Sequence, residues 1–217
     1  MKTAKAVLTA ALVAAMPAIT ATAEVPKPDV VTRLQVFMPQ RAEDWDGGSG
    51  VELQARFWAN ESFATALSIG FASWTAKSEF SEASDEAGYM STFISGDVDI
   101  TPVGVSAIYR NNVSDRVAIV FEMGLRYLFM ESNISAEITT DDGYDTSYLK
   151  DRILTDSAFV GLLGVNLENE IVDGIRFHLG VGYQFDITET RETFGGQDMG
   201  TTSLDSPMVN VGLTWAF

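Results

Sequence analysis

A two-residue alternation limits the folds open to this chain, because one parity is bulky and apolar and the other is small or charged. It is clearest over residues 116–130, where every second side chain from Val117 to Phe129 is apolar or aromatic and Glu122, Gly124 and Arg126 lie between them. Successive side chains of a β-strand point to opposite faces, so this pattern predicts a strand with two unlike faces. A helix would scatter the charges around its axis.

The same alternation recurs along the chain, less perfectly near the N-terminus, and Pro102 leaves the facing of one segment ambiguous. The eight predicted strands span residues 30–38, 51–59, 63–74, 96–110, 116–130, 157–167, 174–187 and 209–217. No long apolar run suited to a transmembrane helix occurs after the N-terminal segment. The sequence therefore predicts an all-β chain.

The connections between the predicted strands alternate in length. The short ones are residues 60–62, 111–115 and 168–174, and the long polar ones are 39–50, 75–95, 131–156 and 188–206. A β-sandwich would vary its turns at both ends. An antiparallel up-and-down barrel whose two rims face different compartments has short turns at one rim and long loops at the other. We therefore predict a single eight-stranded barrel over residues 24–217.

Side-chain size indicates which face of this barrel is apolar. An eight-stranded barrel has room inside only for modest side chains, so the bulky parity would overfill it. If the bulky parity faced inward, the small or charged parity would face lipid. Each arginine on it would then cost about 2–4 kcal/mol near the midplane. We therefore expect a transmembrane β-barrel with an apolar exterior, and the alternative is a lipocalin-like barrel with an apolar interior. The candidate residues for an interior salt-bridge plug are Glu52, Arg56, Glu122, Arg126 and Arg176.

Aromatic residues on the bulky parity gather near both ends of the predicted strands. Phe57 and Phe63 lie near short connections, whereas Phe71 and Phe129 lie near long ones. Two aromatic rows are typical of the two membrane interfaces of an outer-membrane barrel.

The N-terminus has the pattern of a secretory signal peptide. Two lysines precede an apolar stretch that contains Pro17, and the small residues ATA at 21–23 fit a cleavage site near Ala23. Removing residues 1–23 would change the formal net charge from −16 to −18, because that segment holds two lysines and no acidic residue. Such an acidic chain is unsuited to nucleic acid. Zero cysteines exclude disulfides and thiolate zinc sites.

The last segment, VNVGLTWAF, places Val209, Val211, Leu213, Trp215 and Phe217 on one parity. This pattern resembles that of bacterial outer-membrane barrels, which typically end in Phe with apolar residues at alternate preceding positions. With the predicted strands and signal peptide, the chain resembles the small barrel group that includes the OmpA membrane domain, OmpX, OmpW and opacity-type proteins. The resemblance implies residence in the bacterial outer membrane, contact with its lipid and lipopolysaccharide, and recognition of the terminal strand as an assembly signal by the outer-membrane assembly machinery.

No catalytic group is predicted. Small outer-membrane lipid hydrolases place a Ser nucleophile and a His base two residues apart on a strand, whereas the single His lies in HLG, 178–180, with Gly180 in the Ser position. Acidic stretches in the long connections could hold Ca²⁺ or Mg²⁺ through oxygen ligands, but none matches the EF-hand pattern. We expect a solvated acidic surface, with no metal and no cofactor.

The function predicted from these features is a non-enzymatic structural or surface-interaction role, such as adhesion or envelope integrity, through acidic extracellular loops. The alternative is an OmpW-like channel for small hydrophobic molecules. That alternative needs an interior pocket that opens sideways to lipid, with an apolar lining such as Val120, Leu128, Val160, Leu162 and Met208.

Overall fold

The computed structural model describes residues 28–40, 45–85, 88–141 and 146–217, in which all regular structure is β-strand. The predicted signal peptide, residues 1–23, lies outside the described residues. No helix in the described ranges is long and apolar enough to cross a membrane. Eight strands build the barrel wall: β1 Asp29–Phe37, β2 Trp45–Trp58, β3 Phe63–Asp85, β4 Gly88–Asn112, β5 Val117–Ser132, β8 Ala158–Val172, β9 Ile175–Asp186 and β12 Ser206–Ala216.

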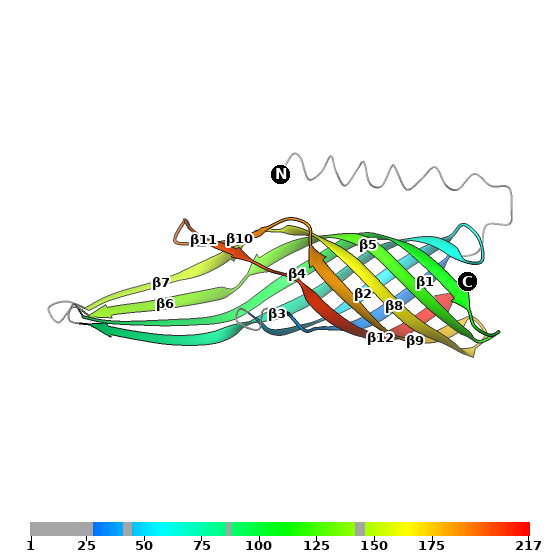
Figure 1. Cartoon of the computed structure of the whole chain (residues 1–217), viewed down its shortest axis with the longest axis horizontal. Helices are drawn as coiled ribbons and strands as arrows, with labels where there is room; N and C mark the ends of the chain where they lie inside the picture. The colour runs from blue at the N-terminus through cyan, green and yellow to red at the C-terminus, as the bar shows by residue number, and fades with distance from the viewer. Residues whose placement is uncertain (1–27, 41–44, 86–87, 142–145) are drawn as a thin grey trace.

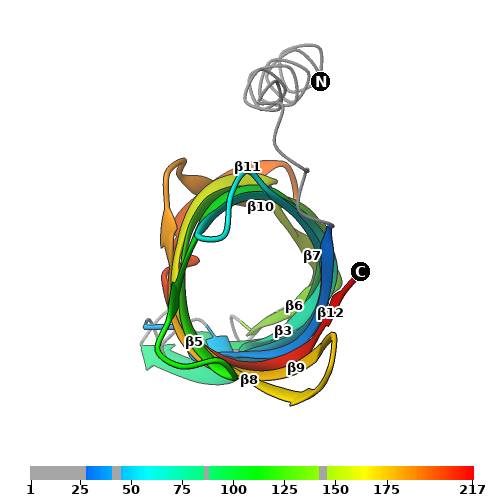
Figure 2. The ribbon, with the colours of Figure 1, turned by 90° about the vertical axis from the view of Figure 1, so that its right-hand side faces the viewer.

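The wall closes on itself through antiparallel neighbours. β1 pairs with both β2 and β12, and β5 pairs with both β4 and β8, so the order β1-β2-β3-β4-β5-β8-β9-β12 returns to its start. Figure 2 shows these strands as a ring viewed along its axis. The predicted eight-stranded antiparallel barrel is therefore confirmed, and each predicted strand overlaps one strand of the wall.

The two rims of the barrel differ. At one rim, which we call the short-turn rim, the strands are joined across residues 59–62, 113–116 and 173–174. Strand β1 begins at this rim and β12 ends there. At the opposite rim, the long rim, the wall continues beyond the barrel as an extended sheet, which Figure 1 shows projecting away from the C-terminal end.

The extended sheet corrects the interpretation of the long connections as loops alone. It consists of the upper parts of β3 and β4 together with β6 Ile134–Asp141, β7 Thr146–Thr155, β10 Thr190–Phe194 and β11 Gln197–Thr202. β4 pairs with β5 below and with β6 above. The exchange occurs at Gly96, whose φ is +141° and where a Cβ would lie 2.5 Å from the Asn133 carbonyl oxygen. The sequence did not reveal these strands because their polar residues give the alternation little contrast in hydrophobicity.

The bulky parity faces outward and the small or charged parity faces inward. On β5, Phe121 and Met123 are 44% and 64% exposed, whereas Glu122 and Arg126 are 3% and 2% exposed. The exposed Phe121 and Phe129 are eight residues apart on one strand. For a strand tilted by about 40°, this separation corresponds to about 20 Å along the barrel axis. The outer face therefore has an apolar band between two levels of aromatic residues.

Candidate functional site

The barrel interior is the candidate site because it gathers most of the buried charge. Near the short-turn rim, a connected set of buried or half-buried polar side chains fills it, and we call this set the ion network. Its members are Asp29, Arg33, Glu52, Gln54, Arg56, Arg110, Glu122, Arg126, Glu168 and Arg176.

The upper part of the ion network is built around Arg33 of β1. Its Nη1 lies 2.8 Å from Glu122 Oε2 and 3.5 Å from Glu52 Oε1, and its Nη2 donates to Gln54 Oε1 at 2.6 Å. Gln54 Nε2 in turn donates to Glu122 Oε1 at 2.8 Å, and Glu52 also pairs with Arg126. Strands β1, β2 and β5 are thus linked across the lumen by charge-assisted hydrogen bonds, the stronger class of protein hydrogen bond.

The lower part of the ion network is centred on Glu168 of β8. Its two carboxylate oxygens pair with Arg56 at 2.5 Å and with Arg110 at 3.0 Å. Arg110 also pairs with Asp29 at 3.0 Å, and its guanidinium lies 4.0 Å from the centroid of the Trp58 ring. Arg56 Nε donates to Gln54 Oε1 at 2.8 Å, so the upper and lower parts are continuous.

The five plug candidates differ in where the structure places them. Glu52, Glu122 and Arg126 lie in the upper part and Arg56 in the lower part, all nearly inaccessible. The Arg176 side chain is 23% exposed and stands at the edge, where Nη1 is 3.6 Å from Asp29 and Nε is 4.0 Å from Glu170. The structure thus joins four of the candidates tightly and the fifth loosely.

Half of the ion network was not identified from the sequence. Asp29 and Arg33 lie in or beside the segment with imperfect alternation, and Arg110 lies in the segment that Pro102 made ambiguous. Glu168 was assigned to a short connection, whereas β8 continues to Val172. The parity of each strand, extended to its true ends, was the signal that could have identified them.

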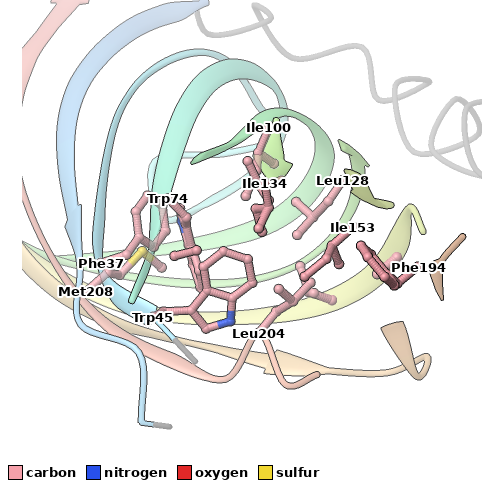
Figure 3. Close-up of a cluster of buried hydrophobic side chains, with 14 of the residues drawn as sticks. Phe37, Trp45, Trp74, Ile100, Leu128, Ile134, Ile153, Phe194, Leu204 and Met208 are labelled. Atoms are coloured by element: carbon pink, nitrogen blue, oxygen red, sulfur yellow. The ribbon is translucent and has the colours of Figure 1, made fainter. Parts of the chain in front are cut away.

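The half of the interior toward the long rim is apolar, and we call this cluster the apolar layer (Figure 3). Its buried members are Phe37, Trp45, Trp74, Ala76, Val98, Ile100, Leu128, Ile134, Ala136, Ile153, Ala158, Val160, Leu162, Phe194, Leu204 and Met208. The Trp74 ring is 5.5 Å from that of Phe37 and 5.8 Å from that of Trp45, the second in an edge-on contact. Large side chains therefore occupy the lumen above the ion network.

A connection between strands inserts into this apolar layer. Leu204, between β11 and β12, is fully buried, and its carbonyl accepts from Gln184 Nε2 at 3.1 Å. Asp186 at the end of β9 accepts from the Leu204 amide and from the Ser203 hydroxyl, both at 2.9 Å. These hydrogen bonds hold the segment 203–205 across the long rim.

The apolar side chains that a hydrophobic channel would need all face the interior. Leu128, Val160, Leu162 and Met208 belong to the apolar layer. Val120 lies instead in a smaller cluster with Trp58 and Ile108, toward the short-turn rim.

The single histidine and the acidic residues show no catalytic or metal-binding arrangement within the described ranges. His178 is fully buried on the inner face of β9, and neither ring nitrogen has a hydrogen-bond partner among the described residues. No group of three or more His, Asp or Glu side chains suited to a metal ion occurs in the part of the chain that the structure describes. A recess of about 480 Å³ opens at the short-turn rim, and Arg110, Glu168 and Arg176 are among its lining residues.

The predicted assembly-signal residues lie along β12 and just beyond it. Val209, Val211, Leu213 and Trp215 are paired with Val36, Leu34, Thr32 and Val30 of β1, which closes the barrel. Phe217 follows the strand and is 63% exposed. The alternating apolar residues therefore face outward along the seam between the first and last strands.

Searches against known proteins identify the fold. No protein-family model matches the sequence, and the search of curated proteins gives no match. Among solved structures, Neisserial surface protein A is similar with a TM-score of 0.53 and 12% identity, over 88% of this chain and 97% of that one. The outer membrane protein OprG from Pseudomonas aeruginosa is similar with a TM-score of 0.55 and 9% identity, over 89% and 96%.

These similarities agree with the closed ring of strands, the outward apolar band and the inward charges. At such low sequence identity the comparisons identify the fold. The chain has the fold of the small eight-stranded outer-membrane β-barrels.

Proposed function

We propose that this protein is a non-enzymatic barrel of the bacterial outer membrane with a closed interior, and that it acts structurally or through contacts made by its extended sheet. The predicted signal peptide, cleaved near Ala23, would direct the chain 24–217 across the inner membrane. Lipid and lipopolysaccharide surround the barrel, and the β12 residues described above are the signal for the assembly machinery.

The observation that carries this proposal is that two unlike layers fill the interior at successive heights. The ion network crosses the lumen near the short-turn rim, and the apolar layer crosses it near the long rim. An ion would have to disrupt the first layer and then lose its hydration in the second, and both steps are costly. The acidic extended sheet, rather than the lumen, is then the part available for contacts.

Conductance of the refolded protein in planar bilayers tests the closed interior. We expect no steady single-channel current from the wild type or from Glu122→Ala and Arg126→Ala, because the apolar layer remains intact in both variants. Heat-modifiable migration on SDS gels serves as the control that each sample is folded. Steady open-channel current from the folded wild type would overturn the proposal.

The second candidate function is a channel for small hydrophobic molecules, and one observation favours it. The apolar face of the interior continues along the inner face of the extended sheet, where exposure rises from 3% at Ile134 to 53% at Leu149. A hydrophobic molecule could follow this face toward the apolar layer, and the ion network beneath would force it to leave sideways into lipid.

Contact quenching of tryptophan fluorescence by a small brominated hydrocarbon distinguishes the two candidates, since Trp45 and Trp74 lie in the apolar layer. The closed-interior proposal predicts the same loss of fluorescence intensity in the wild type and in a Trp45→Phe/Trp74→Phe variant, because the quencher then contacts only the outward-facing Trp215. A saturable signal that disappears in this variant would favour the channel.

A further inference from the structure

Two arginines on the outward face of the extended sheet stand beside exposed apolar side chains. We define the β7–β10 patch as Arg152 and Leu154 on β7, Arg191 on β10, and Ile187 between β9 and β10. All four are exposed, with Leu154 at 57% and Ile187 at 51%. The patch therefore combines two cationic and two apolar groups on one surface.

Strand pairing brings these residues together. Thr193 is paired with Leu154, and the Asp156 amide donates to the Arg191 carbonyl at 3.0 Å, so Arg191 lies two pairs beyond Leu154 toward the barrel, opposite Asp156. Residues two apart on a strand share a face and lie about 7 Å apart, which places Arg152 and Arg191 on either side of Leu154.

The patch adjoins the upper aromatic level of the barrel. The Ile187 amide donates to the Phe159 carbonyl at 3.0 Å, and the Phe159 ring lies 4.7 Å from that of Tyr127. Aromatic residues at this level mark the boundary between hydrocarbon and lipid headgroups in outer-membrane barrels. The β7–β10 patch is thus at headgroup height.

The two guanidinium groups lack an ion-pair partner in the part of the chain that the structure describes. No carboxylate there lies within 4.0 Å of Arg152 or Arg191. Lys150, on the same face of β7, differs because it pairs with Glu137. In a chain with a formal net charge of −16, two such guanidiniums on one face are a local exception in charge, and the carboxylate of Asp156, opposite Arg191, forms no ion pair with it.

We propose that the β7–β10 patch binds a phosphate group of lipopolysaccharide in the leaflet around the long rim. Guanidinium groups hold phosphate through paired hydrogen bonds, and Arg152 and Arg191 flank the position where such a phosphate would sit. Leu154 and Ile187 contact the hydrophobic part of the same molecule. These apolar neighbours favour a lipid over a free anion. The inference rests on the proposed outer-membrane location.

Binding of lipid A to the refolded full chain in detergent tests the patch. The variants are Arg152→Gln, Arg191→Gln and the double variant, and the matched control is Arg116→Gln, which removes an exposed arginine at the opposite rim. We expect each patch variant to weaken binding about tenfold, as the loss of a charged hydrogen bond implies, and the control to bind like the wild type. Wild-type affinity in the double variant would overturn the proposal.

Two further probes separate the lipid from its phosphate. Dephosphorylated lipid A should bind the wild type as weakly as intact lipid A binds the double variant, and inorganic phosphate should not compete at equal concentration. Equal binding of the dephosphorylated lipid, or full competition by phosphate, would contradict a lipid phosphate site. Heat-modifiable migration and the absence of conductance are measured on the same samples, so that failure of the patch is distinguished from failure of the proposed function.

Discussion

The ion network makes a quantitative prediction at Glu122. Its carboxylate pairs with Arg33 at 2.8 Å and accepts from Gln54 at 2.8 Å, and Glu122 is 3% exposed. The substitution Glu122→Ala removes the nearest counter-charge of Arg33 and leaves that guanidinium buried in the lumen. The variant therefore loses one contact and also leaves the buried Arg33 charge without its main partner.

The magnitude follows from what Arg33 retains. Breaking a buried ion pair by removing one partner costs about 3–5 kcal/mol. Arg33 keeps its hydrogen bond to Gln54 at 2.6 Å and a weaker contact with Glu52 at 3.5 Å, so we expect the lower end, about 3 kcal/mol of unfolding free energy. The double variant Arg33→Met/Glu122→Leu removes both charges, and its stability should lie within about 1 kcal/mol of the wild type or above it.

Urea unfolding of the barrel refolded into lipid vesicles, followed by tryptophan fluorescence, measures these differences. The matched control is Glu137→Ala, which breaks the exposed pair with Lys150 and should cost under about 1 kcal/mol. A loss below about 1 kcal/mol in Glu122→Ala would refute the reasoning. A double variant as unstable as Glu122→Ala would also refute it. The instability would then persist although the unpaired Arg33 charge had been removed.

Other substitutions test the apolar layer, the insertion at the long rim, the barrel seam and the assembly signal. Trp74→Ala should cost about 3–5 kcal/mol in the same unfolding assay, because Trp74 is 1% exposed between two aromatic rings. Leu204→Ala should cost about 2–5 kcal/mol, and an unchanged midpoint would exclude the insertion described above. Gly212→Ala should abolish heat-modifiable migration, since its Cβ would lie 1.9 Å from the Thr32 carbonyl oxygen on β1. Deleting Phe217 should lower assembly in cells while refolding into detergent is unchanged, and equal losses in both assays would contradict an assembly signal.

The amino-acid pattern alone predicts the fold class and, for strands with clear alternation, which residues face the interior. Alternation is a local property, so Glu122 and Arg126 could be assigned to the interior from β5 alone, and the bulk of Phe121 and Phe129 required the outside. Where alternation was weak, this reasoning failed, as it did for Arg33 and for the strands of the extended sheet.

Which inward residues meet, and at what height in the barrel, follows from the folded chain and not from the pattern of any one strand. Arg56 and Glu168 are 112 residues apart in sequence and become partners because the register around the barrel brings β2 and β8 to the same level. The same register separates the interior into an ion network and an apolar layer. Hydrogen bonding between neighbouring strands, from β2 around the wall to β8, sets this register, whereas the pattern within one strand carries only its parity.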